Sequence, residues 1–257
     1  MNVRISVIMP FLNSHEIVRR QIINFRNMDL PDEVEVLFMD DGSDPPLQMP
    51  DNPPRNFMIH ATNDFRPWTS SLARNRGAKL ATGEYLLMVD GDYILTRKAV
   101  MRCLEYGGDR LGFRRQFAVL DENGNFTQDK KTLLAWGLPE SRFHSRKGLT
   151  FSPHPNNYLM RRQLFLDMGG YDEKLIVNRG YPQRDDTHFK GLYRKWVNLG
   201  KIREDTFERP TIYMFPNGQF CGDVDYNPFN LFHTLTRKTP DNYWYHHPRY
   251  PKDGTTT

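Results

Sequence analysis

Apolar residues gather in short continuous runs along the first part of the chain, and each run has the length and continuity of a buried strand. These runs cover residues 4–11, 34–39, 57–61 and 85–89. Between them, apolar residues recur with the spacing of an amphipathic helix, in segments 14–26, 70–80 and 97–106. We expect Pro10 to end the first strand and Ser14 to cap the first helix. This alternation, with short connections, predicts an α/β fold with a mostly parallel, doubly wound sheet.

The pattern becomes irregular in the second half of the chain. The segments that still show one are a strand over 111–119, a hairpin turn at 121–125, a strand followed by a helix over 157–168, and a helix over 185–199. The last of these places Phe189, Leu192, Tyr193 and Trp196 on one apolar face.

The end of the chain has a different composition. From residue 237 it is rich in proline and aromatic residues, which we interpret as a wrapping extension rather than a domain. We therefore expect one domain over 1–236, with halves 1–106 and 107–236, followed by an extension over 237–257.

Carboxylate side chains directly follow two of the predicted strands. Asp40 and Asp41 come after the second strand, and Asp90 and Asp92, separated by Gly91, come after the fourth. Carboxylates are costly to bury without a partner, and open α/β sheets bind ligands at the carboxyl ends of their strands. We therefore expect Asp90 and Asp92 at the exposed carboxyl end of their strand, where Gly91 allows a sharp turn, and the loop with Asp40 and Asp41 at the same edge of the sheet. Such oxygen donors suit Mg²⁺ or Mn²⁺, together with substrate phosphates.

Composition limits the class of protein. The 257 residues carry a formal net charge of +4, which fits an anionic substrate or a nucleic acid but equally an ordinary surface. The two cysteines give neither a disulfide framework nor a zinc spacing. No segment has the roughly 20 consecutive apolar residues of a membrane-spanning helix, and the first strand begins too early for a signal peptide. We expect a cytoplasmic protein without a transmembrane segment; a peripheral membrane contact stays open.

Several polar motifs occur in a fixed order along the chain. They are residues 5–10 with Asn13, residues 40–43, residues 73–77 with 81–85 and 90–92, residues 169–173, and residues 184–186. This set resembles the nucleotide-sugar-dependent glycosyltransferases of family 2, which have the GT-A fold. The resemblance covers roughly residues 3–199. It implies that residues 1–106 bind the nucleotide sugar and that residues 107–236 form the acceptor side.

The resemblance also implies roles for the residues at the strand ends. The first acidic pair contacts the nucleotide base, commonly uracil, with Asp41 the better candidate. Asp90 reaches the ribose or the donor sugar, and Arg74 faces the nucleotide or its diphosphate. The complete donor-binding set implied in this way is Pro10, Asn13, Asp40, Asp41, Arg74, Asp90 and Gly91.

The resemblance implies a divalent metal, Mn²⁺ or Mg²⁺, bound by Asp92 as part of a DXD motif. Some relatives complete the metal site with a downstream histidine, for which His233 is the candidate, with His154 and His246 behind it. The family often has a third acid after the metal motif, and here that position is Tyr93.

The catalytic base is implied by the last motif and is assigned to Asp186. Asp185 takes the place of the glutamate that usually precedes it, so either carboxylate can be the base. The start of the predicted helix would help to keep such a carboxylate ionised. The implied reaction is an inverting, metal-dependent transfer of a sugar from a nucleotide-diphosphate sugar, with a UDP-sugar favoured, to an acceptor hydroxyl. The acceptor is a glycan, a protein or a modified nucleic acid.

Two further classes of protein fit the same motifs. The chain could be a non-catalytic module that binds a sugar or a nucleic acid on the same fold. It could also be a nucleotidyltransferase, although the loop 10–14 lacks the glycine and the basic residues that such enzymes use. Single motifs also fit purely structural roles: a plain turn for the first acidic pair, helix capping for Asp185 and Asp186, and a surface ion pair for Arg74.

Overall fold

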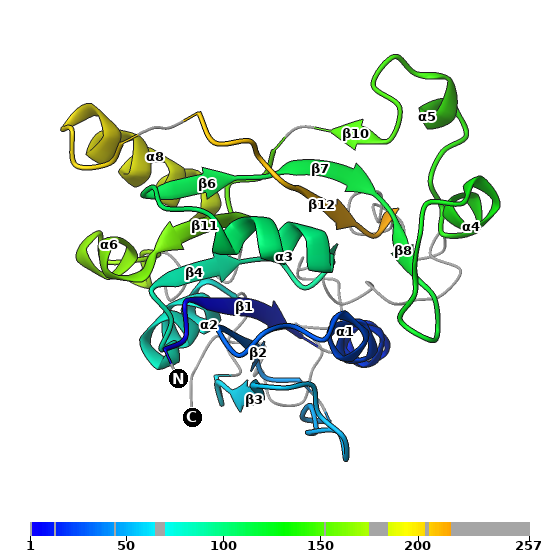
Figure 1. Ribbon diagram of the computed structural model, residues 1–257, viewed down its shortest axis with the longest axis horizontal. Helices are drawn as coiled ribbons and strands as arrows, with labels where there is room; N and C mark the ends of the chain where they lie inside the picture. The colour runs from blue at the N-terminus through cyan, green and yellow to red at the C-terminus, as the bar shows by residue number, and fades with distance from the viewer. Residues whose placement is uncertain are drawn as a thin grey trace, which may run out of the picture.

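The computed structural model describes residues 2–12, 14–43, 45–64, 70–151, 153–174, 185–203 and 206–216 (Figure 1). Within these residues the main sheet has six strands in the order β3-β2-β1-β4-β11-β6. Their bounds are β1 Ile5–Phe11, β2 Val34–Asp40, β3 Phe57–Ala61, β4 Tyr85–Met88, β6 Arg110–Gly112 and β11 Tyr158–Arg161. The first four are mutually parallel, and β11 is antiparallel to both of its neighbours. The predicted α/β fold with a mostly parallel sheet is confirmed.

Helices cover both faces of this sheet. One core contains side chains of α1 (His15–Met28) and α3 (Arg97–Leu104), and the other contains side chains of α2 (Ser70–Leu80), α6 (Arg162–Asp167) and α8 (Asp185–Asn198). Strand β1 contributes Val7 to the first core and Ile8 to the second, as the alternation of side chains along a strand requires. The predicted apolar face of α8 is confirmed, because Phe189 is buried in the second core and its three predicted partners pack against that core.

A smaller sheet lies beside the main one, in the order β10-β7-β12-β5 (Figure 1). Its strands are β5 Tyr93–Ile94, β7 Arg114–Phe117, β10 Thr150–Phe151 and β12 Thr211–Met214. The remaining described elements are the pair β8 Val119–Leu120 and β9 Phe126–Thr127, with α4 Lys130–Ala135 and α5 Ser141–His144. The predicted hairpin turn is confirmed, because Asp121 donates its backbone N–H to the carbonyl of Asn125 at 2.9 Å.

The prediction of one strand over 111–119 is wrong. The segment contributes to β6, β7 and β8, which belong to three different sheets. Phe113, between β6 and β7, is 2% exposed, so the chain changes sheets while it stays in the core. The apolar positions of this segment are interrupted by Arg114, Arg115 and Gln116, and such a broken pattern does not require one straight strand.

Two predictions for the start of the chain need correction. Pro10 does not end β1, which continues to Phe11. The paired part of β4 ends at Met88, opposite Ile8, so Pro10 lies beyond that ladder and its missing N–H costs nothing there. Ser14 occupies the N-cap position of α1, but its hydroxyl donates to the carbonyl of Leu12 at 2.8 Å and makes no capping bond.

A buried carboxylate, Glu35, connects the strands near the amino ends of β1 and β4. Glu35 is 5% exposed. It accepts hydrogen bonds from the Ser6 hydroxyl at 2.5 Å and from the backbone N–H of Thr82 at 2.7 Å. These bonds join β1, β2 and the turn before β4, so they fix the start of the strand that carries Asp90 and Asp92 at its far end.

Part of the predicted chain lies outside the described residues. These parts are Asn13, Arg184 of the last motif, residues 217–257 with His233 and His246, and the boundary at 236/237. The domain boundaries therefore stay predictions. Among the residues that the structure describes, no helix is long and apolar enough to cross a membrane.

Candidate active site

The carboxyl ends of β1, β2 and β4 meet at one edge of the main sheet. Strand β1 lies between the other two and is parallel to both, with Phe11 opposite Asp40. Gly91 is packed against the end of β1, where an added Cβ would lie 2.7 Å from the Phe11 ring and 2.8 Å from the Pro10 carbonyl oxygen. This close approach explains why the turn between the two acids needs glycine. The strand order and this packing place the acidic loops after β2 and β4 on either side of β1.

The two acids after β2 are both buried, at 2% exposure each. Asp40 uses its two carboxylate oxygens within its own loop, where they accept the backbone N–H groups of Ser43 at 2.8 Å and Leu47 at 2.9 Å. Asp40 therefore has the turn-forming role. Asp41 donates its backbone N–H to the Phe11 carbonyl at 2.8 Å, which ties the loop to β1. Of the pair, Asp41 stays the better candidate for a nucleotide contact.

Asp90 is held by partners from two distant segments. Its backbone N–H donates to Asn157 Oδ1 at 2.8 Å, and Asn157 Nδ2 donates back to the Asp90 carboxylate at 3.0 Å. Arg74, from α2, forms an ion pair with the other carboxylate oxygen. The Arg74 side chain is only 4% exposed and lies 5.8 Å from the centre of the Tyr171 ring. Arg74 therefore does not form a surface ion pair, because its charge is buried beside the strand end.

Asp92 has a different environment from Asp90. Its backbone carbonyl accepts the N–H of Phe215 at 3.0 Å, which anchors the loop to the end of β12. No described side chain donates a hydrogen bond or an ion pair to its carboxylate. Burial, and then the negative charge of Asp90, raise the pKa of Asp92 to about 7, against weaker opposing effects of Arg115 and Arg74. A carboxylate that lacks a compensating positive partner favours binding of a cation.

Tyr93 takes the place of the third acid and serves the fold. Its ring is 2% exposed, and its hydroxyl is hydrogen bonded to the guanidinium of Arg115 on β7. Burial raises the pKa of Tyr93 well above its usual range, so it stays neutral. Tyr93 thus joins the loop with Asp90 and Asp92 to the smaller sheet and offers no charge to a ligand.

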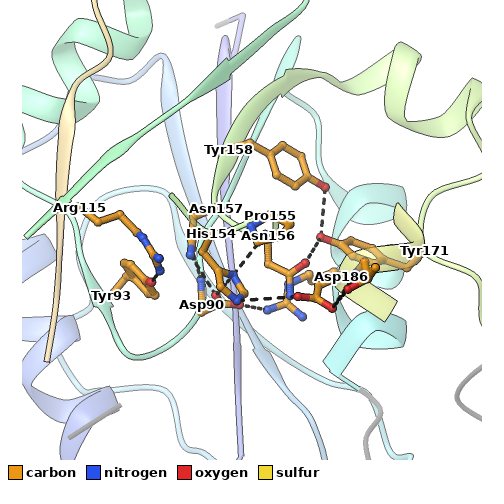
Figure 2. A network of polar contacts seen from close by, with 12 residues as sticks. Asp90, Tyr93, Arg115, His154, Pro155, Asn156, Asn157, Tyr158, Tyr171 and Asp186 are labelled. Atoms are coloured by element: carbon orange, nitrogen blue, oxygen red, sulfur yellow. Dashed lines mark hydrogen bonds and ion pairs between the residues drawn. The ribbon is translucent and has the colours of Figure 1, made fainter. Parts of the chain in front are cut away.

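The second candidate acid group lies at the start of α8. The helix begins at Asp185, whose side chain is outside the described residues. One carboxylate oxygen of Asp186 accepts the backbone N–H of Thr187 at 2.6 Å, and the side chain is 30% exposed. His154 lies between the two acid groups: its Nε2 is 4.0 Å from Asp186, and its Nδ1 is 3.4 Å from the Asp90 carboxylate (Figure 2). The structure therefore brings Asp90 and Asp186 to opposite sides of one imidazole.

Aromatic packing fixes the position of α8. The Phe189 ring stacks on Tyr171 with centroids 4.5 Å apart and on Tyr158 with centroids 5.4 Å apart. The Tyr171 hydroxyl donates to Asn156 Oδ1 at 3.0 Å (Figure 2). Because Phe189 follows Asp186 on the same helix, this cluster determines where the Asp186 carboxylate lies.

The glycine pair before Tyr171 is tied to α2. Asn75 accepts the backbone N–H of Tyr171 at 2.9 Å and donates to its carbonyl at 2.8 Å. Gly170 has φ of +65°, and an added Cβ would lie 2.5 Å from Asn75 Oδ1, so only glycine fits. The fourth motif and the Asn75 of the third motif thus form one unit that supports the aromatic cluster.

Two residues of the site were missed or undervalued in the sequence. Asn157 was not predicted as a partner of Asp90, and His154 ranked only as a reserve metal ligand. Both precede β11, which is antiparallel to β4. In the sequence they form only a polar segment before a predicted strand. Nothing in that segment shows which strand the predicted strand pairs with. An antiparallel neighbour of β4 necessarily brings its amino end to the carboxyl end of β4.

The described residues can supply few ligands to a divalent metal. No group of three or more His, Cys, Asp or Glu side chains that could hold an ion occurs in the described part of the chain. The carboxylate of Asp92 still fits Mg²⁺ or Mn²⁺, because these ions commonly bind one or two carboxylates and complete their shell with water and substrate phosphates. His233 is outside the described residues.

Solved structures similar to this one include S. aureus TarS. The TarS fragment 1–349 matches with a TM-score of 0.52 and 19% identity, over 85% of this chain and 62% of that chain. A second TarS structure matches with a TM-score of 0.45 and 19% identity, over 74% and 33%. TarS 1–349 in complex with UDP-GlcNAc matches with a TM-score of 0.43 and 21% identity, over 66% and 49%. This chain therefore spans less than two thirds of each, and the first match supports the fold alone. No curated protein matches the chain.

The family model for "Glycosyl transferase family 2" matches residues 6–169. The match runs from β1 to the end of α6, so it includes the loops with Asp41, Asp90 and Asp92 as well as the Asn157 segment. It ends before α8 and β12. Because the match covers more than half of the 257 residues, this chain belongs to glycosyl transferase family 2.

Proposed function

We propose that this protein transfers a sugar from a nucleotide-diphosphate sugar, with a UDP-sugar as donor, to an acceptor hydroxyl, and inverts the anomeric carbon. The observation that supports this most is the placement of Asp90 and Asp186 on opposite sides of His154. Glycosyl transfer needs one charged region for the leaving diphosphate and another for the attacking hydroxyl. Here β4 supplies the first and α8 supplies the second.

The leaving-group side consists of Asp92, Asp90 and Arg74. Asp92 is the residue that would hold Mn²⁺ or Mg²⁺, and a bound ion would neutralise the diphosphate as a Lewis acid. Asp90 is oriented by Arg74 and Asn157, so its carboxylate has a fixed position for hydrogen bonds from the hydroxyls of the ribose or the donor sugar. Asp41, in the neighbouring loop, is the proposed contact for the uracil.

The attacking side consists of Asp186 and His154. The acceptor oxygen attacks the anomeric carbon, its proton passes to the Asp186 carboxylate, and the bond to the diphosphate oxygen breaks with its electron pair leaving on the diphosphate. Attack opposite to the departing bond inverts the configuration. General base catalysis of this kind contributes on the order of 10²–10⁴ in rate. The backbone N–H of Thr187, in the first turn of α8, fixes one oxygen of this carboxylate at 2.6 Å.

Asp186→Asn tests the base without removing the donor site. We expect the variant to bind UDP in the presence of Mn²⁺ with unchanged affinity in calorimetry and to lose transfer and donor hydrolysis by at least about 10²-fold. Asp92→Asn should instead lose the dependence of UDP binding on Mn²⁺. Asp167→Asn, an exposed acid on α6, is the matched control.

The proposal fails if none of a panel of UDP-, GDP- and dTDP-sugars is hydrolysed or transferred while UDP still binds. That result would identify a binding module. Release of pyrophosphate from a nucleoside triphosphate would instead indicate a nucleotidyltransferase.

A further inference from the structure

A pocket of about 670 Å³ lies beside the proposed base, and the proposed function does not account for it. Its lining includes His154 and Asn157, which also contact Asp90 and Asp186. The rest of the lining comes from β6, from the outer part of α8 and from the segment before β12. The pocket therefore opens on the acceptor side of the site.

The lining of this pocket is strongly basic. It contains four cationic side chains and no aspartate or glutamate: Arg110, Lys190, Arg194 and Arg209. None of the four forms an ion pair with a carboxylate in the described part of the chain. An unneutralised group of cations around one cavity raises the local concentration of anions.

Helix α8 connects the base to two of these cations. Asp186, Lys190 and Arg194 are spaced by four residues, which places them along one side of the helix. The helix rises 1.5 Å per residue, so the cations follow the base by roughly 6 Å and 12 Å along the axis. A molecule whose hydroxyl faces Asp186 therefore extends its neighbouring groups towards Lys190 and Arg194.

The guanidinium of Arg110 is positioned by contacts with neighbouring residues. It lies 4.7 Å from the centre of the Tyr158 ring and 4.3 Å from that of Tyr193, and one nitrogen donates to the Pro155 carbonyl at 3.4 Å. Its Nε is buried and has no hydrogen-bond partner among the described residues. Such an arginine loses little side-chain freedom when it binds an oxyanion.

We propose that this pocket binds a phosphate of the acceptor, so that the acceptor is a polyhydroxy compound that carries phosphate. The inference rests on the proposed function for the identity of the attacking group. Planar guanidinium groups bind phosphate oxygens in pairs, and Arg110 and Arg194 reach the pocket from β6 and α8. The phosphate then fixes which hydroxyl of the acceptor lies next to Asp186.

The aromatic side chains favour an acceptor without bases over a nucleic acid. Single-stranded nucleic acids bind by stacking bases on open aromatic rings. In this pocket Arg110 covers a face of Tyr193, Arg102 lies 4.0 Å from the centre of the Phe207 ring, and Phe113 is buried. An arginine thus covers one face of Tyr193 and one face of Phe207, which leaves less open ring surface for stacking bases.

The test uses the full chain with its donor site filled by UDP and Mn²⁺. The probe is a fluorescein-labelled tetramer of abasic phosphodiester units, titrated at low salt and followed by anisotropy. We expect the wild type to bind it and the Lys190→Gln/Arg194→Gln variant to bind at least tenfold more weakly. The matched control, Lys147→Gln/Lys195→Gln, removes two exposed charges outside the pocket lining and should stay within twofold of the wild type.

Three results would overturn the inference: no binding by the wild type, equal losses in both double variants, or tenfold tighter binding of a base-bearing oligonucleotide of the same length. The last result would assign the pocket to nucleic acid. The measurement needs no turnover, so it is separate from the donor assay. Loss of sugar transfer with intact phosphodiester binding would refute the proposed function alone.

Discussion

Replacing Asp92 with asparagine should stabilise the metal-free protein at alkaline pH. The folded state raises the pKa of Asp92 from 3.8 to about 7, first through burial and then through Asp90. Between these two values the folded protein keeps a proton that the unfolded chain has lost. Stability therefore falls as pH rises through this window, and above pH 7 the full cost of the buried charge is present.

The magnitude follows from the shift. Three pKa units correspond to an upper bound of about 4 kcal/mol at 1.36 kcal/mol per unit. Asp92 as a residue is partly exposed, so we expect about 1–2 kcal/mol to remain after solvent screening. For a chain of this size, that difference raises Tm by roughly 2–8 °C.

Thermal and urea unfolding of the wild type and Asp92→Asn in EDTA, at pH 5 and pH 8, measures the effect. We expect a clear gain for the variant at pH 8 and a much smaller one at pH 5. Addition of Mn²⁺ should raise Tm of the wild type and leave the variant unchanged. Asp167→Asn controls for the loss of an exposed acid. A variant that is no more stable than the wild type at pH 8 would refute the view that Asp92 is an uncompensated charge.

Three further substitutions test how the site is supported. Phe189→Ala should lower the free energy of unfolding by about 3–4 kcal/mol in urea, because it removes the ring between Tyr158 and Tyr171. It should also lower sugar transfer more than UDP affinity. Phe189→Leu should restore most of the stability and most of the transfer activity. Gly91→Ala should weaken UDP binding at least tenfold in calorimetry, because its Cβ meets Phe11, whereas Gly107→Ala, which meets nothing within 4 Å, should not. The hydrogen bond from Arg19, assisted by Arg20, lowers the pKa of Glu16 from 4.5 to about 2, so its contribution is present above pH 4.5 and is lost towards pH 2. Glu16→Gln should therefore cost about 1 kcal/mol at pH 7 and less at pH 3 in urea melts, after allowance for its exposure.

Local patterns predicted the elements that carry the site. The apolar runs predicted β1, β2 and β4 closely, because each strand is buried on both faces and forms a continuous apolar sequence. The cost of burying a carboxylate predicted an exposed strand end for Asp90 and Asp92, which are partly exposed, but gave no sign that Asp40 and Asp41 are buried. The sequence did not predict the different roles of Asp40 and Asp41. Both are buried equally, and only the hydrogen bonds of the folded loop distinguish them.

Contacts between segments far apart in the chain could not be predicted from local sequence patterns. Asn157 and His154 reach Asp90 because β11 pairs antiparallel with β4, and no local feature of either segment specifies that pairing. The burial of Arg74 could not be predicted for the same reason. It depends on Asp90 and Tyr171, which neutralise and cover the guanidinium from two other elements.

Helix α8 connects the proposed base to the proposed acceptor pocket. Asp186 lies in its first turn, Phe189 fixes the helix to the core, and Lys190 and Arg194 line the pocket. A rigid helix cannot move the base without moving both cations. If the pocket binds an acceptor phosphate as proposed, residue spacing sets the distance from that phosphate to the attacking hydroxyl. An acceptor with a longer or shorter spacer between phosphate and hydroxyl should then bind the pocket yet react slowly.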